Sequence, residues 1–235
     1  IGPAPAVESY LVIDRLIVSD LAVRYSDQTA NTFAEMQGLS LNLSRSSTRP
    51  LAGPLSMAGP GTFRRGDHST TLTTLEGRLA FDGVAISVEN LTIGAPEGRA
   101  EVSGTYDVLA TEPQLRLRGA GDLDVARLAG WSGPNVPAGG RLAFSAIVNG
   151  SELAVDASST DLTWPGMGVM TLGSRVTVFE GTATVESLRL TVAGGEVSAT
   201  GRLAAVEGRP SVADVRWRNV DVGVLAAGAA PMPWR

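Results

Sequence analysis

The chain has no cysteine and no lysine, and it has a single histidine. Without cysteine it forms no disulfide, offers no thiol nucleophile and cannot build a cysteine-ligated zinc site. Without lysine it lacks the P-loop lysine, the Schiff-base amine and the Ser-Lys dyad, because all nineteen basic residues are arginine. One histidine leaves too few ligands for a transition-metal site. We therefore expect that the protein binds no metal and no cofactor and is not an enzyme.

Charge and long apolar runs are also scarce. Acidic and basic residues are interspersed at a formal net charge of −5, and the adjacent pair Arg64-Arg65 is typical of a solvated loop rather than of a phosphate or headgroup site. Nothing resembles the basic footprint of a nucleic-acid-binding protein. The longest weakly polar stretch, residues 222–232, is too short and too rich in Gly and Pro to span a bilayer.

A long internal repeat is the most informative feature that is present. Residues 78–130 and 175–227 correspond without a gap at an offset of 185 − 88 = 97, as Val88-Glu89 answers Val185-Glu186. The offset also pairs Gly104 with Gly201. Apolar alternation, turn glycines and a closing Asp-Val-x-x-Leu-Ala recur, whereas no set of reactive side chains does. Copying a scaffold without chemistry indicates a protein that builds length or surface.

Alternation with a period of two dominates the chain and predicts an all-β fold of about fifteen antiparallel strands. The stretch 10–25 predicts either two strands around a tight turn or one bulged long strand, and 70–75 predicts a strand. At most two short helices are expected, at 124–130 and 221–227, each with an N-terminal Asp cap. We divide the chain into a linker (1–9), a first β segment (10–77), repeat unit one (78–174) and an incomplete repeat unit two (175–235). We expect these parts to form one continuous domain that is a fragment of a larger protein.

The alternation places apolar residues on one side of each strand and polar residues on the other. Such a sheet cannot leave its apolar face in water, so it folds into a sandwich, closes into a barrel or curls into an open trough. We predict the trough, a long curled antiparallel sheet with an open apolar groove. Its lining residues are Leu79, Phe81, Leu115, Leu117, Leu142, Phe144, Leu153, Val155, Leu188, Leu190 and Val192.

Candidate catalytic residues are few. His68 lies in a polar loop beside Asp67, with no nucleophile elbow elsewhere, and an exposed loop histidine is the better interpretation. Asp122 and Asp124 lie two apart on one side of a strand, as a glycosidase pair could, but nothing indicates a cleft around them.

The chain resembles the AsmA-like family of Gram-negative envelope proteins, including its TamB branch. The likeness rests on residues 13–27, on the recurrent Val-Glu-x-Leu…Gly…Gly unit at 88–104 and 185–201, and on the Asp-x-x-x-Leu endings at 124–128 and 221–225. It covers nearly the whole chain. The family implies a periplasmic curled sheet that binds phospholipid acyl chains in an apolar groove. It also implies carriage of lipid between the two membranes or help in outer-membrane assembly, an outer-membrane assembly barrel as a partner, and an inner-membrane anchor outside this segment.

Two other interpretations stay open from the sequence. A structural or adhesive β-repeat protein would pack its apolar face against a second sheet about 10 Å away. An enzyme on a β-sandwich would have a pocket of convergent polar groups with strongly shifted pKa values.

Overall fold

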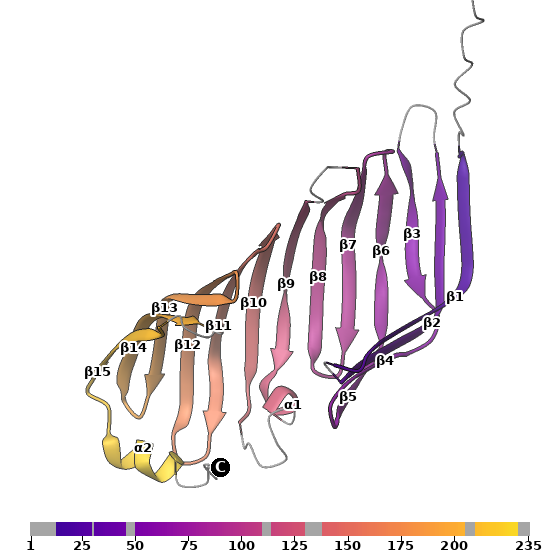
Figure 1. Ribbon diagram of the computed structural model, residues 1–235. Coiled ribbons are helices and arrows are strands. Elements are labelled where there is room, and N and C mark those ends of the chain that lie inside the picture. The colour runs from indigo at the N-terminus through magenta and orange to yellow at the C-terminus, as the bar shows by residue number, and fades with distance from the viewer. Residues whose placement is uncertain are drawn as a thin grey trace, which may run out of the picture.

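The computed structural model describes residues 13–29, 31–45, 50–109, 114–129, 138–204 and 210–229, which form fifteen strands and two short helices (Figure 1). The strands are β1 (Arg15–Asp27), β2 (Thr32–Ser44), β3 (Leu51–Met57), β4 (Gly61–Arg65), β5 (His68–Leu72), β6 (Thr74–Phe81), β7 (Ala85–Ala95), β8 (Gly98–Asp107), β9 (Leu115–Asp124), β10 (Arg141–Asn149), β11 (Glu152–Trp164), β12 (Gly168–Phe179), β13 (Thr182–Val192), β14 (Gly195–Ala204) and β15 (Val212–Arg218). The helices are α1 (Val125–Ala129) and α2 (Val222–Ala229).

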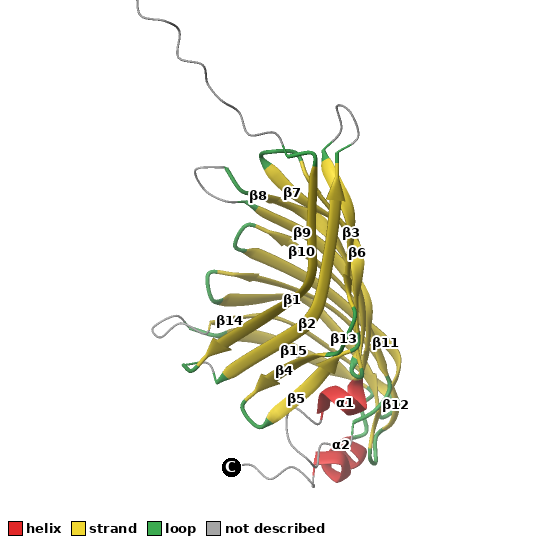
Figure 2. Cartoon of the chain, turned by 90° about the vertical axis from the view of Figure 1, so that its right-hand side faces the viewer, coloured by secondary structure: helices red, strands yellow, loops and turns green. Residues whose placement is uncertain are grey.

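All fifteen strands belong to one antiparallel sheet, in which β6 to β15 lie side by side in chain order. The sheet is not closed, because β1 and β15 lie at opposite ends of it. It curls as a single layer, with both helices at its lower end (Figure 2). The prediction of an all-β curled open sheet with two short helices is confirmed. The two-layer sandwich is not the fold of the described residues.

The N-terminal part of the sheet is bent along a line that crosses neighbouring strands. β2 pairs with β3 along one half, from Leu39 to Ser44, and with β4 along the other, from Thr32 to Glu35. The bend coincides with left-handed backbone at Asp20 in β1 (φ 56°) and Gly38 in β2 (φ 67°). As a result the β4–β5 hairpin lies turned out of the plane of β3 and β6 (Figure 1).

The strand boundaries correct two sequence expectations. The strand predicted over 70–75 is wrong, because Thr73 separates β5 from β6 at the bend and its N–H donates to the Gly94 carbonyl oxygen (2.8 Å). The stretch 10–25 becomes one bulged long strand, β1, with register shifts between Val18 and Val23; residues 10–12 lie outside the described residues.

The sequence repeat is a structural repeat. The elements β7, β8, β9 and α1 begin at Ala85, Gly98, Leu115 and Val125, and β13, β14, β15 and α2 begin at Thr182, Gly195, Val212 and Val222. Every member of the second set starts 97 residues after its counterpart, for example 182 − 85 = 97. The bulges recur at the same offset, between Val88 and Leu91 and between Val185 and Leu188. The repeated sequence therefore encodes where each strand begins, where the bulge lies and that a helix follows, although β15 is shorter than β9.

Both predicted helix caps are present. The Asp124 side chain accepts a hydrogen bond from the Arg127 N–H (3.1 Å) at the start of α1. Asp221 accepts from the N–H groups of Gly223 (2.8 Å) and Val224 (3.3 Å) at the start of α2. These carboxylates satisfy N–H groups that the first turn of a helix leaves unpaired.

Little of the sheet is fully buried. The buried apolar residues among those described are Leu39, Leu43, Leu51, Ala80, Ala129 and Val192. A single layer has no interior for a larger core, so the backbone ladder and contacts between neighbouring side chains of one face hold the strands together.

A substitution at Gly104 in β8 would test how closely this strand lies against β9. A Cβ there would lie 2.0 Å from the Arg116 carbonyl oxygen, and the backbone has φ +153°. We expect Gly104→Ala to lower the free energy of unfolding by about 2 kcal/mol or more, measured by urea denaturation. Gly173→Ala is the control, because a Cβ at Gly173 meets no atom within 4 Å; it should change stability by less than about 0.5 kcal/mol. Equal effects of the two substitutions would contradict this account.

Candidate functional site

The strand register separates the sheet into two chemically different faces, because residues paired across an antiparallel ladder point to the same side. One row of paired residues crosses the ten strands β3 and β6 to β14. Its members are Gly53, Leu79, Val88, Gly104, Leu117, Val148, Leu153, Val178, Ala183 and Leu203. All of them are apolar. We call the side that contains this row the apolar face.

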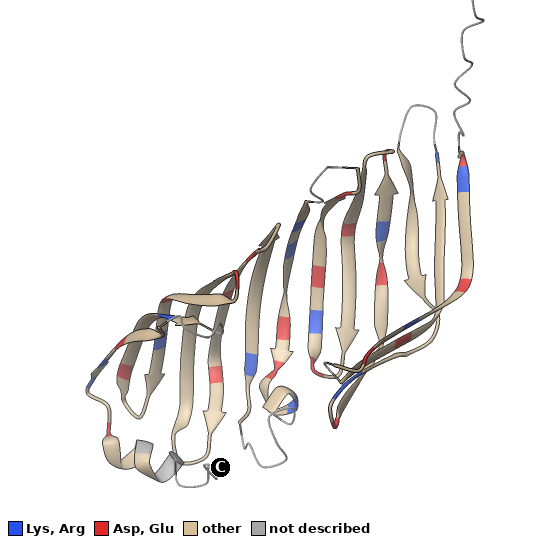
Figure 3. Ribbon diagram, in the orientation of Figure 1, with Lys and Arg blue, Asp and Glu red and all other residues tan. Residues whose placement is uncertain are grey.

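The apolar face carries no charged residue in the ladder-paired positions of β6 to β15. The acidic and basic residues of those strands lie on the other side, which we call the polar face, and they are spread along the strands (Figure 3). Ion pairs form there between Arg78 and Glu89 (3.6 Å) and between Arg175 and Asp156 (2.7 Å). The separation of charge from apolar surface is therefore continuous over the length of the sheet.

The register places all eleven predicted lining residues on the apolar face. They come from five strands: Leu79 and Phe81 in β6, Leu115 and Leu117 in β9, Leu142 and Phe144 in β10, Leu153 and Val155 in β11, and Leu188, Leu190 and Val192 in β13. Their contact with a ligand stays a prediction.

Other strands contribute equally to this face, although the sequence analysis did not name their residues. Val88 and Ile93 of β7, Val102 of β8, and Val176 and Val178 of β12 pair directly with its members. The same alternation would have identified them. In β7 a bulge between Val88 and Leu91 shifts the period of the alternation by one residue.

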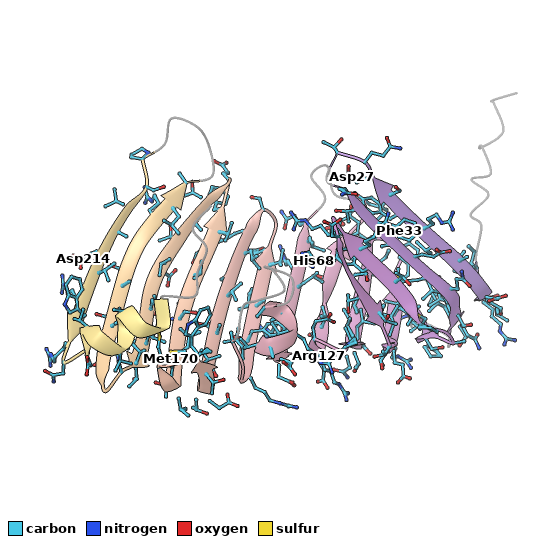
Figure 4. The ribbon with its side chains drawn as sticks, turned by 90° about the horizontal axis from the view of Figure 1, so that it is seen from below. Asp27, Phe33, His68, Arg127, Met170 and Asp214 are labelled. Atoms are coloured by element: carbon cyan, nitrogen blue, oxygen red, sulfur yellow. The ribbon has the colours of Figure 1, made fainter. Side chains whose placement is uncertain are left out.

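The apolar face is the less exposed of the two. In β10, Leu142, Phe144, Ala146 and Val148 are half-buried, whereas the alternate residues from Arg141 to Asn149 are exposed. The described residues form one layer, and the side chains on it stand free of a second sheet (Figure 4). Lower exposure without a covering layer is expected on the inner side of a curled sheet, where side chains converge. We therefore expect the apolar face to lie on the inner side of the curl.

Both helices lie at one end of the strands (Figure 2). The Asp221 N–H before α2 donates to the Ala193 carbonyl oxygen (3.3 Å), which ties the start of α2 to the β13–β14 turn. Val192, beside this turn, is only 2% exposed. Val192 is the one predicted lining residue that is buried.

The two aspartates that the sequence offers as catalytic candidates take part in an ion pair and in a helix cap. Asp122 forms an ion pair with Arg141 on the polar face (Oδ2–Nη1 3.4 Å), and Asp124 caps α1. His68 begins β5, opposite Arg65 in the ladder of the β4–β5 hairpin (Figure 4). The described residues contain no group of three or more His, Asp or Glu side chains that could hold a metal ion.

The hollows described on the sheet lie on the polar face. One of about 660 Å³ lies over β10 to β13 and is open to solvent; small residues such as Ala143, Ser158 and Gly173 form its floor, between the longer Asp156 and Arg175. Asp156 accepts a hydrogen bond from Arg175 and raises the pKa of that guanidinium. This hollow is a gap between ion-paired side chains on an exposed surface, and it lacks the enclosure that small-molecule sites usually have.

No helix among the described residues is both long and apolar enough to cross a membrane. Comparison of the chain with protein-family models, with curated proteins and with solved structures found no match. The functional argument therefore rests on the two faces of the sheet.

The bulge in β11 offers a test of local electrostatics. The Arg141 N–H and the Ser159 hydroxyl both donate to Asp161 Oδ1 (3.0 Å each), and these bonds lower the pKa of Asp161. A carboxyl group whose pKa is lower in the folded state stabilises the folded protein at pH values above its unfolded-state pKa of about 3.9. This stabilisation is lost as the pH falls through the folded-state pKa. We expect Asp161→Asn to reduce the urea midpoint at pH 7, with the difference from wild type vanishing in strong acid. A difference independent of pH would contradict the role of the carboxylate charge.

Proposed function

We propose that this chain is a periplasmic segment of a Gram-negative envelope protein that conducts phospholipids between the inner and outer membranes or assists outer-membrane assembly. The acyl chains would lie along the apolar face. The observation that carries the proposal is the row of ten apolar residues from Gly53 to Leu203 on a sheet that remains open. The resemblance to AsmA-like proteins supports the same interpretation.

The energetics explain why such a face would serve lipid transfer. Exposing acyl chains to water costs about 0.8 kcal/mol per CH₂, or on the order of 25 kcal/mol for two sixteen-carbon chains. A barrier of that size corresponds to a wait of about days per event. A continuous apolar surface removes most of it while the headgroup stays in water.

The dimensions and composition fit a chain-like apolar guest. At about 4.8 Å per strand, the ten-strand row extends roughly 43 Å, longer than the roughly 30 Å hydrocarbon core of a bilayer. Leu, Val, Ala and Gly dominate it, and these side chains offer contact without hydrogen-bonding groups. Such a surface would bind acyl chains by burial and would not select among headgroups.

The partners that follow from the proposal are phospholipid acyl chains along the sheet and an outer-membrane assembly barrel protein at one end. A structural or adhesive role remains the competing function. The two differ in one observable, since only the conduit requires lipid on the apolar face.

A charge placed on the apolar face should stop lipid passage. Phe144 pairs with Gly121 and Ala157 in the middle of the sheet. We expect Phe144→Arg, and likewise Leu117→Arg, to reduce lipid transfer between donor and acceptor vesicles at least tenfold, because a charge among acyl chains costs about 2.5–3.5 kcal/mol. The free energy of unfolding should fall by only about 1 kcal/mol, since the face is half open.

The matched control is Ser145→Arg, which adds the same charge to the polar face one residue along β10. It should leave transfer unchanged. Equal loss of folding and transfer in Phe144→Arg would favour a packed structural core instead.

Bound lipid is the most direct readout. Native mass spectrometry of the purified chain should reveal co-purifying phospholipid. A photo-crosslinker at Leu117 should capture lipid in cells, whereas one at Thr105, on the polar face of the neighbouring strand, should not. Absence of lipid in both experiments, with the chain folded, would refute the conduit.

A further inference from the structure

The β4–β5 hairpin turns out of the plane of β3 and β6, between which it lies in the chain (Figure 1). The first half of β2 turns with it, because β2 pairs with β4 from Thr32 to Glu35. The hairpin lies at the same end of the strands as the two helices (Figure 2). The direction of the turn decides whether the hairpin leaves the apolar face open or gives it a second wall.

The apolar face continues around the bend. Ladder partners, and residues two apart in a strand, share a side of the sheet. Such steps lead from Gly53 of the apolar face across β3, β2 and β1 to a residue of β2 just beyond the bend. The steps are Leu55, Leu41, Leu39, Leu21, Val23 and Met36.

The same side of the hairpin carries apolar residues. Ala34, two residues before Met36, pairs with Phe63 of β4, and Phe63 pairs with Thr70 of β5. Leu72 follows Thr70 by two residues and therefore shares its side. We call this the apolar side of the hairpin.

A hydrogen bond shows the direction of the turn. The Thr70 hydroxyl donates to Glu97 Oε2, in the turn between β7 and β8. Side chains from the two parts of a bent sheet can meet only on the inner side of the bend, and Thr70 lies on the apolar side of the hairpin. The hairpin is therefore folded toward the apolar face.

The burial of the hairpin agrees with this direction. Phe63, Thr70 and Leu72 are half-buried, whereas the alternate residues on the other side of both strands are exposed. Thr73 joins the end of the hairpin to β7, because its N–H and its hydroxyl both donate to the Gly94 carbonyl oxygen (2.8 and 3.1 Å). One sheet, bent on itself, thus forms two walls that meet at a corner.

We propose that the corner between the β4–β5 hairpin and strands β6 and β7 is a two-walled site for an acyl chain, which binds there more tightly than on the rest of the apolar face. Phe63 and Leu72 belong to the hairpin wall. Leu75 and Ile93, which pair across β6 and β7 beside the junction, belong to the sheet wall. This inference rests on the proposed function, since it concerns the same apolar guest.

Two walls increase binding because the free energy of burial follows the apolar area removed from water. An acyl chain on a single layer keeps its outer side in water, whereas a chain in the corner also loses water on the side of the hairpin. The apolar side ends at the hairpin tip, where Arg65 pairs with His68. Polar groups therefore bound the corner at that tip.

Photo-crosslinkers placed singly at Phe63, Leu117 or Thr62 rank the two parts of the apolar face. The purified chain is titrated with vesicles of phosphatidylethanolamine and phosphatidylglycerol. The lipid concentration for half-maximal capture should be about tenfold lower at Phe63 than at Leu117. Thr62, on the other side of β4, should capture no lipid. Capture at Phe63 that needs as much lipid as capture at Leu117 would overturn the proposal.

A charge in the corner should empty the corner alone. With the crosslinker at Leu72, Phe63→Arg should raise the lipid concentration for half-maximal capture by about tenfold or more, while capture at Leu117 stays unchanged. The matched control Thr62→Arg adds the same charge to the other side of β4 and should change neither. The crosslinker ranking needs no added charge, so it decides the question if Phe63→Arg does not fold.

Introduced cysteines test the direction of the turn, because the chain has none of its own. A short bismaleimide reagent should join Thr70→Cys to Glu97→Cys. It should join Thr71→Cys to Glu97→Cys far less, since Thr71 points to the other side of the hairpin. Equal joining of the two pairs would contradict a hairpin folded toward the apolar face.

The outcomes separate the corner site from the proposed function. Lipid captured at Leu117 and none at Phe63 would overturn the corner site and leave the conduit intact. No lipid at either position, with the chain folded, would overturn both.

Discussion

Among the described residues no second layer lies opposite the apolar face of this sheet, and the rest of the described structure depends on that constraint. Each strand pairs with its neighbours through a backbone ladder, and these ladders hold the described residues in one layer. Apolar side chains can then contact only their neighbours on the same face. Residues such as Leu142 and Phe144 are accordingly half-buried and not fully buried. The described residues thus form a sheet with an apolar surface that no second layer of them covers.

The internal repeat copies backbone geometry. The bulges after Val88 and Val185, and the Asp124 and Asp221 caps, recur at the same spacing. Gly104 and Gly201 also share a purpose, since a Cβ at either would meet a carbonyl oxygen of the next strand, at 2.0 and 2.5 Å. A repeat of this kind lengthens the sheet by a defined unit while it preserves which face is apolar.

Charged residues distinguish the polar face from the apolar face more than they stabilise the sheet. The Arg78–Glu89, Arg141–Asp122 and Arg175–Asp156 pairs are exposed on both partners, and exposed ion pairs typically contribute about 0–1 kcal/mol each. Their consistent placement on the polar face keeps that side hydrated along the whole sheet. The aspartates that the sequence offered as a catalytic pair have structural roles, one in an ion pair and one in a helix cap.

Alternation in the sequence determined which residues share a face, since side chains of a strand point to opposite sides with a period of two. It was enough to place Leu117, Phe144 and the other lining residues together. Tertiary structure decided which of the folds compatible with this alternation the chain adopts. The same pattern suits a sandwich, a barrel or an open trough, and only the ladder partners of each strand distinguish them. The sequence also did not predict the break at Thr73 between β5 and β6, because the pattern of residues 70–75 is typical of a single strand. It arises because β2 changes partner from β3 to β4, a long-range pairing that no local pattern encodes.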